Sequence, residues 1–327
     1  MFGKMMNSYY YGKSGKGDYR KEDLPQNRWQ LFWEMLKIRL SGLCRLNLMY
    51  AVVWIPALLV VLSAASDWVS ISFYTLEQQD LLQQGALTAD AYAQAVIGLD
   101  DATNALILRT LIFLIPCIAI TGPFTAGAAF VTRNWARDEH AFIWSDFRDA
   151  VKENWKQGLV ISGITAVMPT IFYVCWMFYG QMTDENVFFV VPQTLSIMLV
   201  ALWLCSLLYM YPLMVTYKLR LRDLFRNGLL LAVGRLPATV GLKLLSLLPV
   251  LITAIIAIFG GVGWAFLFAA LYYIVIGFSL SRFVGASYAN AVFDRFINPN
   301  IEGAEVNRGL YTDEDEEDEY GEAADAE

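Results

Sequence analysis

Long stretches without charged residues alternate with short basic segments along the chain. The uncharged stretches cover 46–66, 110–132, 157–183, 186–217 and 244–281. A bilayer core about 30 Å thick needs about 20 helical residues, so each of the first four is long enough for one transmembrane helix. The fifth is too long for a single helix, and three glycines predict a hairpin within it: Gly260, Gly261 and Gly263.

This pattern predicts an all-α integral membrane protein with six transmembrane helices. We place them at about 47–66, 110–131, 158–179, 192–216, 240–259 and 264–281. Prolines lie in or at every span except the last, so several helices are expected to be proline-kinked. The fifth span includes Lys243. We interpret this lysine as snorkelling to the lipid headgroups, and a charged functional site is the alternative.

The same pattern divides the chain into three regions. Residues 1–25 are predicted to be a basic flexible tail, residues 26–298 the membrane domain, and residues 299–327 a disordered acidic tail. The stretch "TDEDEEDEYGEAADAE" in this last region carries ten acids and no base, and such a run repels itself. The net charge of −7 therefore becomes +3 for the remainder of the chain once these ten acids are set aside.

The one sizeable external segment is the helical loop 67–104. Its sequence predicts two short helices broken at Gly85 and Gly98, with Thr88 capping the second. We interpret it as a polar lid, and a solute-recognition cap is the alternative. Arg109, at the outer edge of the second span, is expected to pair with one of the acids in this loop.

Lysine and arginine residues are confined almost entirely to alternate loops. They occur in 1–45, 132–157, 217–239 and after residue 281, whereas 67–104, 180–191 and 260–263 contain none. Because basic residues mark the cytoplasmic side of a span, we expect both termini in the cytoplasm and a multi-pass protein of the plasma membrane.

Small residues gather on one face of the second predicted helix, around a Gly-Pro pair. A small face lets a neighbouring backbone approach closely, and Pro123 is expected to kink the helix. We therefore predict helix packing at a bend, and a solute path along the bend is the alternative. The predicted packing and kink residues are Thr121, Gly122, Pro123, Thr125, Ala126 and Ala129.

Amphipathic segments precede the outward-going spans. They read "NRWQLFWEMLKIRL", "WSDFRDAVKENWKQ" and "LRDLFRNGLLLAVGRL", and each places aromatic or aliphatic residues on one helical face. We predict interfacial helices on the cytoplasmic side. Their simplest role is membrane anchoring, and a docking surface for a cytoplasmic partner is the alternative.

The residue types that enzymes need are scattered. His140 is the single histidine, and no GxSxG or HExxH motif is present. We therefore expect no enzymatic activity, no catalytic, cofactor-binding or metal site, and no nucleic-acid partner. No Asp or Glu lies within the six predicted spans, which disfavours carboxylate-coupled transport. The cysteines show no C-x-x-C spacing and are expected to act as small apolar residues: Cys44, Cys117, Cys175 and Cys205.

The segment "TGPFTAGAAFVTRNWARDEHAFIWSDFRDAVKENWKQGL" resembles the signature of the YesL family. That family comprises multi-pass membrane proteins of Gram-positive bacteria that carry a domain of unknown function. The matching residues are Thr121, Gly122, Pro123, Ala126, Arg133, Trp144, Asp146, Phe147, Lys152, Asn154 and Gln157. The resemblance implies no catalytic residues, and it implies an association with carbohydrate uptake.

Together these observations favour a non-enzymatic accessory or regulatory membrane protein connected with carbohydrate uptake or utilisation. Its partners would be the lipid bilayer and a membrane transporter or sensor component. The alternative is a channel or transporter for a small solute whose path follows the kinked helices. The candidate partner-contact surface consists of Trp144, Phe147, Lys152 and Asn154.

Overall fold

The structure is a computed structural model that describes residues 25–183 and 185–310. Within these residues the regular secondary structure is entirely helical, as predicted. The predicted basic tail lies almost wholly outside the described residues, as does the acidic tail from residue 311 onward.

The helices follow one another with short connections. In chain order they are α2 (Arg28–Ala51), η2 (Val52–Trp54), α3 (Ile55–Gln83), α4 (Ala89–Ala119), α5 (Thr121–Trp135), α6 (Ser145–Thr183), η3 (Val187–Phe189), α7 (Val190–Thr216), α8 (Leu221–Gly234), α9 (Leu236–Ser246), α10 (Leu248–Gly260), α11 (Val262–Tyr272), η4 (Tyr273–Gly277), α12 (Phe278–Phe296) and η5 (Asn298–Asn300).

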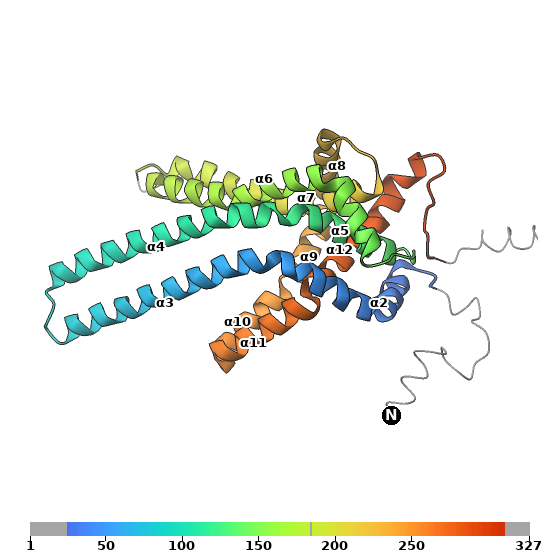
Figure 1. The fold of residues 1–327 in the computed structure, drawn as a ribbon. Coiled ribbons are helices and arrows are strands. Elements are labelled where there is room, and N and C mark those ends of the chain that lie inside the picture. Colours follow the sequence, from blue (N-terminus) through green and yellow to red (C-terminus); the bar gives the residue numbers. More distant parts are fainter. Residues whose placement is uncertain (1–24, 184, 311–327) are drawn as a thin grey trace, which may run out of the picture.

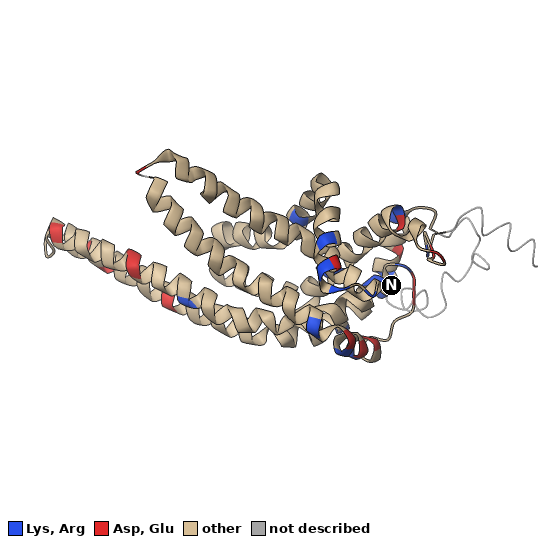
Figure 2. Cartoon of the chain, turned by 90° about the horizontal axis from the view of Figure 1, so that it is seen from above, with Lys and Arg blue, Asp and Glu red and all other residues tan. Residues whose placement is uncertain are grey.

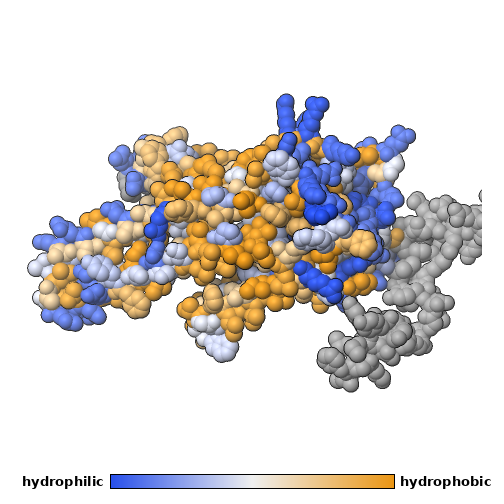
Figure 3. All heavy atoms as spheres, viewed as in Figure 1, coloured by the Kyte–Doolittle hydropathy of each residue, from blue (hydrophilic) through white to orange (hydrophobic). Residues whose placement is uncertain are grey.

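Six helical stretches among the described residues are long and apolar enough to cross a membrane, which agrees in number with the six predicted spans. Figure 1 shows them as three hairpins, α3–α4, α6–α7 and α10–α11, which point the same way. Hydrophobic residues cover much of the visible surface of these hairpins (Figure 3), as a surrounding of lipid requires. The stretches are Arg28–Gln83, Ala89–Ala119, Ser145–Thr183, Val187–Thr216, Leu236–Gly260 and Val262–Asn300.

The opposite end of the molecule is charged. Most of the lysine and arginine residues lie where α2 begins, where α5 connects to α6, on α8 and at the end of α12 (Figure 2). We call this the basic end. The helix α12 reaches it from the middle of the molecule and contacts α2, α5 and α7. Its side chains join both hydrophobic clusters of the core, with Phe283 and Phe293 nearly inaccessible to solvent.

The segment predicted as two short external helices forms instead a long antiparallel hairpin of α3 and α4. Gly85 makes the turn with a φ of 71°, and the Thr88 side chain accepts a hydrogen bond from the Ala91 N–H at 3.3 Å, as predicted. The predicted break at Gly98 is wrong, because this glycine lies inside α4. A glycine costs a helix only about 1 kcal/mol, which the packing of α4 along α3 outweighs.

Arg109 pairs with Asp67, as the sequence suggested, and this ion pair joins α4 to α3.

Candidate functional site

The helices α5 and α6 cross with their backbones in close approach at Gly122 and Gly158. A Cβ atom built on Gly122 would lie 2.1 Å from the carbonyl oxygen of Gly158 and 2.1 Å from Oγ of Ser162. Positions 122 and 158 therefore both need glycine for the backbones of α5 and α6 to approach this closely. The other predicted small residues lie on the same buried side of α5: Thr121, Thr125, Ala126 and Ala129.

Helix α4 ends at Ala119, and α5 begins two residues later. Pro123 has no N–H, so the carbonyl of Ala119 lacks its usual donor four residues ahead. The hydroxyl of Ser162 donates a hydrogen bond to that carbonyl from α6. The proline is therefore tolerated within this apolar region because a neighbouring helix supplies the missing donor.

Beside this crossing, the long apolar helices surround an open space. Two adjoining hollows of about 280 and 260 Å³ share part of their walls, and we call them together the central cavity. Residues of α4, α5 and α6, including Thr121 and Thr125, line the smaller one. The shared wall comes from α7, α9, α10, α11 and α12: Leu207, Tyr211, Lys243, Ser246, Pro249, Tyr272, Ser281 and Arg282.

Two cationic side chains face the central cavity. Lys243 is only partly exposed and belongs to the walls of both hollows. Arg282 also lines both hollows, and its guanidinium carbon lies 5.4 Å from the centre of the Tyr211 ring, a cation–π contact.

No local pattern in the sequence places Arg282 near Lys243. Arg282 ends an uncharged stretch, which predicts a position just after the last span. The structure continues the helix to Phe296, so Arg282 lies well inside it. The small and apolar residues that follow it, "FVGASYANAV", could have indicated this continuation.

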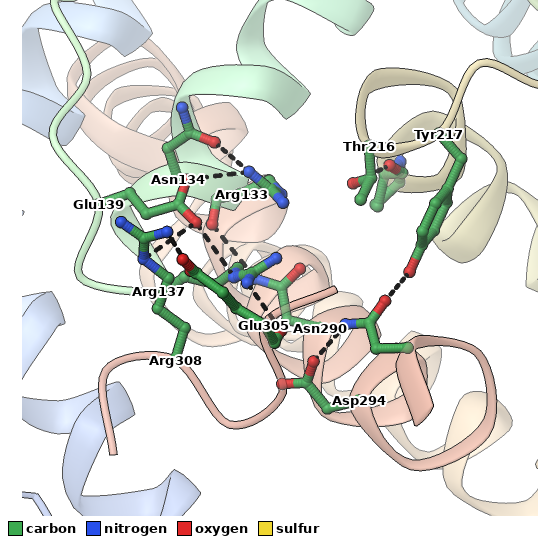
Figure 4. A network of polar contacts seen from close by, with 12 residues as sticks. Arg133, Asn134, Arg137, Glu139, Thr216, Tyr217, Asn290, Asp294, Glu305 and Arg308 are labelled. Carbon is green, nitrogen blue, oxygen red and sulfur yellow. Dashed lines mark hydrogen bonds and ion pairs between the residues drawn. The ribbon is translucent and has the colours of Figure 1, made fainter. Parts of the chain in front are cut away.

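A polar network ties the segments of the basic end together (Figure 4). Glu139, in the α5–α6 connection, accepts a hydrogen bond from Arg133 Nη1 at 3.0 Å and forms an ion pair with Arg137, whose Nε lies 3.2 Å from its carboxylate. Arg308, from the chain beyond α12, reaches the same carboxylate at 3.5 Å. Burial lowers the pKa of the Arg133 guanidinium, and the charge of Glu139 opposes this shift.

A second set of contacts fixes the end of α12. Arg28 forms an ion pair with Asp294, whose carboxylate also accepts a hydrogen bond from the Asn298 side chain. The Tyr217 hydroxyl donates to Asn298 in turn. Burial raises the pKa of the Tyr217 phenol to about 12, and the nearby carboxylate of Asp294 adds to this rise. The start of α2, the end of α7 and the end of α12 are thereby held together.

The four predicted partner-contact residues do not form one surface. Trp144 is 65% exposed and Lys152 is exposed, on the loop before α6 and on its second turn. Asn154 is half-buried and donates to the carbonyl of Ala150 in its own helix at 3.0 Å.

Phe147 differs from the prediction, because it is only 5% exposed and belongs to the core. A Cβ atom on Gly127 of α5 would lie 2.9 Å from the Phe147 ring. The absence of a side chain at Gly127 therefore makes room for this ring between the two helices. Only Trp144 and Lys152 remain of the surface expected from the sequence.

A known family profile matches the part of the chain that contains the α5–α6 crossing. A family profile described as "Protein of unknown function, DUF624" matches residues 102–176. This segment is similar to DUF624. The DUF624 segment runs from within α4 to within α6 and so includes the glycine crossing, part of the cavity wall and Trp144 to Asn154. This match to a domain of unknown function is consistent with the resemblance to the YesL family noted from the sequence. No curated protein and no solved structure matches the chain.

Proposed function

We propose that this chain is a non-enzymatic accessory protein of the plasma membrane whose cytoplasmic face binds a membrane transporter or sensor component. The observation that carries the proposal is that Trp144 and Lys152, both within the DUF624 segment, are exposed at the basic end. Tryptophan is enriched among the residues that anchor protein interfaces. The connection with carbohydrate uptake in a Gram-positive bacterium rests on the resemblance to the YesL family.

The charge of this surface favours an acidic partner. Exposed cations outnumber acids on the first turns of α6, on the connection after α7 and on α8. Such a surface attracts a partner of opposite charge and orients it during the encounter. The exposed cations are Arg148, Lys152, Lys156, Lys218, Arg220, Arg222 and Arg226.

The loop that carries Trp144 is held in place before any partner arrives. Glu139 fixes its beginning through two arginines, and the Phe142 N–H donates to the Asp146 carboxylate at 2.8 Å near its end. The Trp135 indole N–H also donates to the Ala141 carbonyl at 3.4 Å. A pre-organised loop loses less conformational entropy on binding, which favours an interaction surface over a passive connection.

Chemical crosslinking in native membranes, followed by purification of the full chain, tests the proposal. We expect the wild-type chain to recover a transport or signalling protein whose contacting surface is acidic. The double variant Trp144→Ala plus Lys152→Ala should recover at least about tenfold less of it, because interface anchors of this kind contribute about 2 kcal/mol or more.

A matched control removes the same residue types elsewhere. Trp264→Ala plus Lys37→Ala changes an exposed tryptophan at the α10–α11 turn and an exposed lysine of α2, and it should leave recovery unchanged. The proposal fails if purification recovers no membrane partner, or if the control variant reduces recovery as much as the test variant.

A second candidate function is the passage of a small solute, which the central cavity favours because Thr121 and Thr125 of α5 help to line it. Solute flux into proteoliposomes containing only the purified protein distinguishes the two. An accessory protein should show no flux above that of empty liposomes. Flux together with no recovered partner would reverse the order of the two candidates.

A further inference from the structure

The central cavity contains two positive charges and no negative one. Lys243 and Arg282 line it, and no aspartate or glutamate is among its lining residues. Within residues 25–183 and 185–310, neither Lys243 nor Arg282 forms an ion pair. Their like charges repel each other. Other cations of the structure, such as Arg28 and Arg133, do have carboxylate partners. The cavity therefore has an uncompensated charge.

Both cations lie within helices that are candidates to cross the membrane. Lys243 is seven residues from the start of α9, which places it roughly 10 Å along the helix. Arg282 is eight residues before Asn290, whose side chain bonds the Arg133 carbonyl at the basic end, and so lies roughly 12 Å from that contact. Charges at such a depth are unfavourable unless they have partners or serve a function.

We infer that the central cavity binds a ligand bearing a phosphate group, held between Lys243 and Arg282. A phosphate monoester carries between −1.5 and −2 charges near neutral pH, roughly the opposite of two cations. The guanidinium carbon of Arg282 lies 5.4 Å from the centre of the Tyr211 ring, and the planar guanidinium presents N–H groups that can donate to two phosphate oxygens. Lys243 supplies a compact second charge.

The remaining wall suits the same group. The Ser281 hydroxyl lines both hollows and makes no hydrogen bond within the described residues, so it is available as a donor. The larger hollow, about 280 Å³, is at the small end of ligand sites, so it fits a compact headgroup or solute better than an extended one. The phosphate could come from a water-soluble monoester or from a lipid headgroup, and binding does not depend on whether the protein has a partner.

Binding measurements on the purified full-length protein test this inference. One arm uses radiolabelled inorganic phosphate and glycerol 3-phosphate with protein in an uncharged detergent. The other uses lipid nanodiscs and compares retention of phosphatidic acid with retention of phosphatidylcholine. We expect saturable binding in one arm, and the arm that shows it identifies the source of the phosphate.

Two cavity variants assign the binding to these side chains. Arg282→Gln and Lys243→Met should each weaken binding roughly tenfold to a hundredfold, because each removes a charge-assisted hydrogen bond. Lys243→Met should also raise the apparent Tm of the ligand-free protein, because it removes the repulsion between the two cations. A raised Tm would show at the same time that this variant is folded. Lys243→Arg, which keeps the charge, should retain binding.

The control is Arg295→Gln plus Lys37→Met, which removes one exposed cation each from α12 and α2 outside the cavity and should bind like the wild type. The inference is overturned if the folded wild-type protein binds no phosphate compound in either arm. It is equally overturned if Lys243→Met binds as tightly as the wild type, or if the control weakens binding as much as the cavity variants do.

Discussion

A methyl group at Gly122 would meet the backbone of α6. The added Cβ atom would lie 2.1 Å from the Gly158 carbonyl oxygen, whereas ordinary van der Waals contacts begin at 3.4 Å. The helices α5 and α6 would have to separate by about 1 Å or more, and protein interiors have little free space to absorb such a shift. We therefore expect Gly122→Ala to be one of the most damaging conservative changes in the chain.

The magnitude follows from two contributions. Forcing an extra carbon into a packed contact costs about 3 kcal/mol. The same movement breaks the hydrogen bond from Ser162 to the Ala119 carbonyl, which adds about 1 kcal/mol. The apparent Tm of the purified protein should then fall by roughly 8–16 °C, if each kcal/mol shifts it as in soluble domains of similar size.

Gly163→Ala is the matched control. This glycine also lies in α6, but a Cβ atom there would meet nothing within 4 Å. Alanine should therefore raise stability by about 0.5–1 kcal/mol through its better helix propensity. Thermal unfolding in one detergent compares the two variants with the wild type. Equal Tm values for Gly122→Ala and the wild type would refute the proposed close crossing, as would an equal loss at Gly163.

Three further changes probe other contacts. Glu139→Gln should cost about 2 kcal/mol or more in stability, because it leaves two largely buried arginines without a carboxylate; an unchanged apparent Tm would contradict the network. Asp67→Asn should lower the free energy of unfolding by less than about 1 kcal/mol, because its ion pair with Arg109 is half-exposed. A larger loss of stability would mean that this ion pair holds the hairpin together. The raised pKa of Tyr217 stabilises the fold below pH 10, and that contribution is lost as the pH rises toward 12. Tyr217→Phe should therefore lose less stability than the wild type between pH 10 and pH 12, and equal losses would contradict this assignment.

The sequence could predict the spans because length and absence of charge are local properties. The uncharged stretches around Pro169 and Leu199 needed no knowledge of their neighbours, and both became long apolar helices. Gly98 misled because a glycine is only a weak helix breaker, and the packing of α3 on α4 decides its conformation.

The candidate sites were harder to predict because they depend on contacts between distant residues. The ring of Phe147 is buried in the space left by the missing side chain of Gly127, twenty positions earlier. The local amphipathic pattern does not show this contact. Lys243 and Arg282 come together only through the packing of α9 and α12 around the cavity. The small face at Gly122 was visible in the sequence, but its partner Gly158 was not.

Cysteine labelling in intact cells tests the central claim most directly, namely that the chain spans the plasma membrane with its basic end in the cytoplasm. The background is a chain whose four cysteines are replaced by alanine, with either Lys152→Cys at the basic end or Gln84→Cys at the α3–α4 turn. A membrane-impermeant maleimide should label position 84 in intact cells, and position 152 only after permeabilisation. Labelling of position 152 in intact cells would contradict the account and would move the proposed docking surface outside the cell.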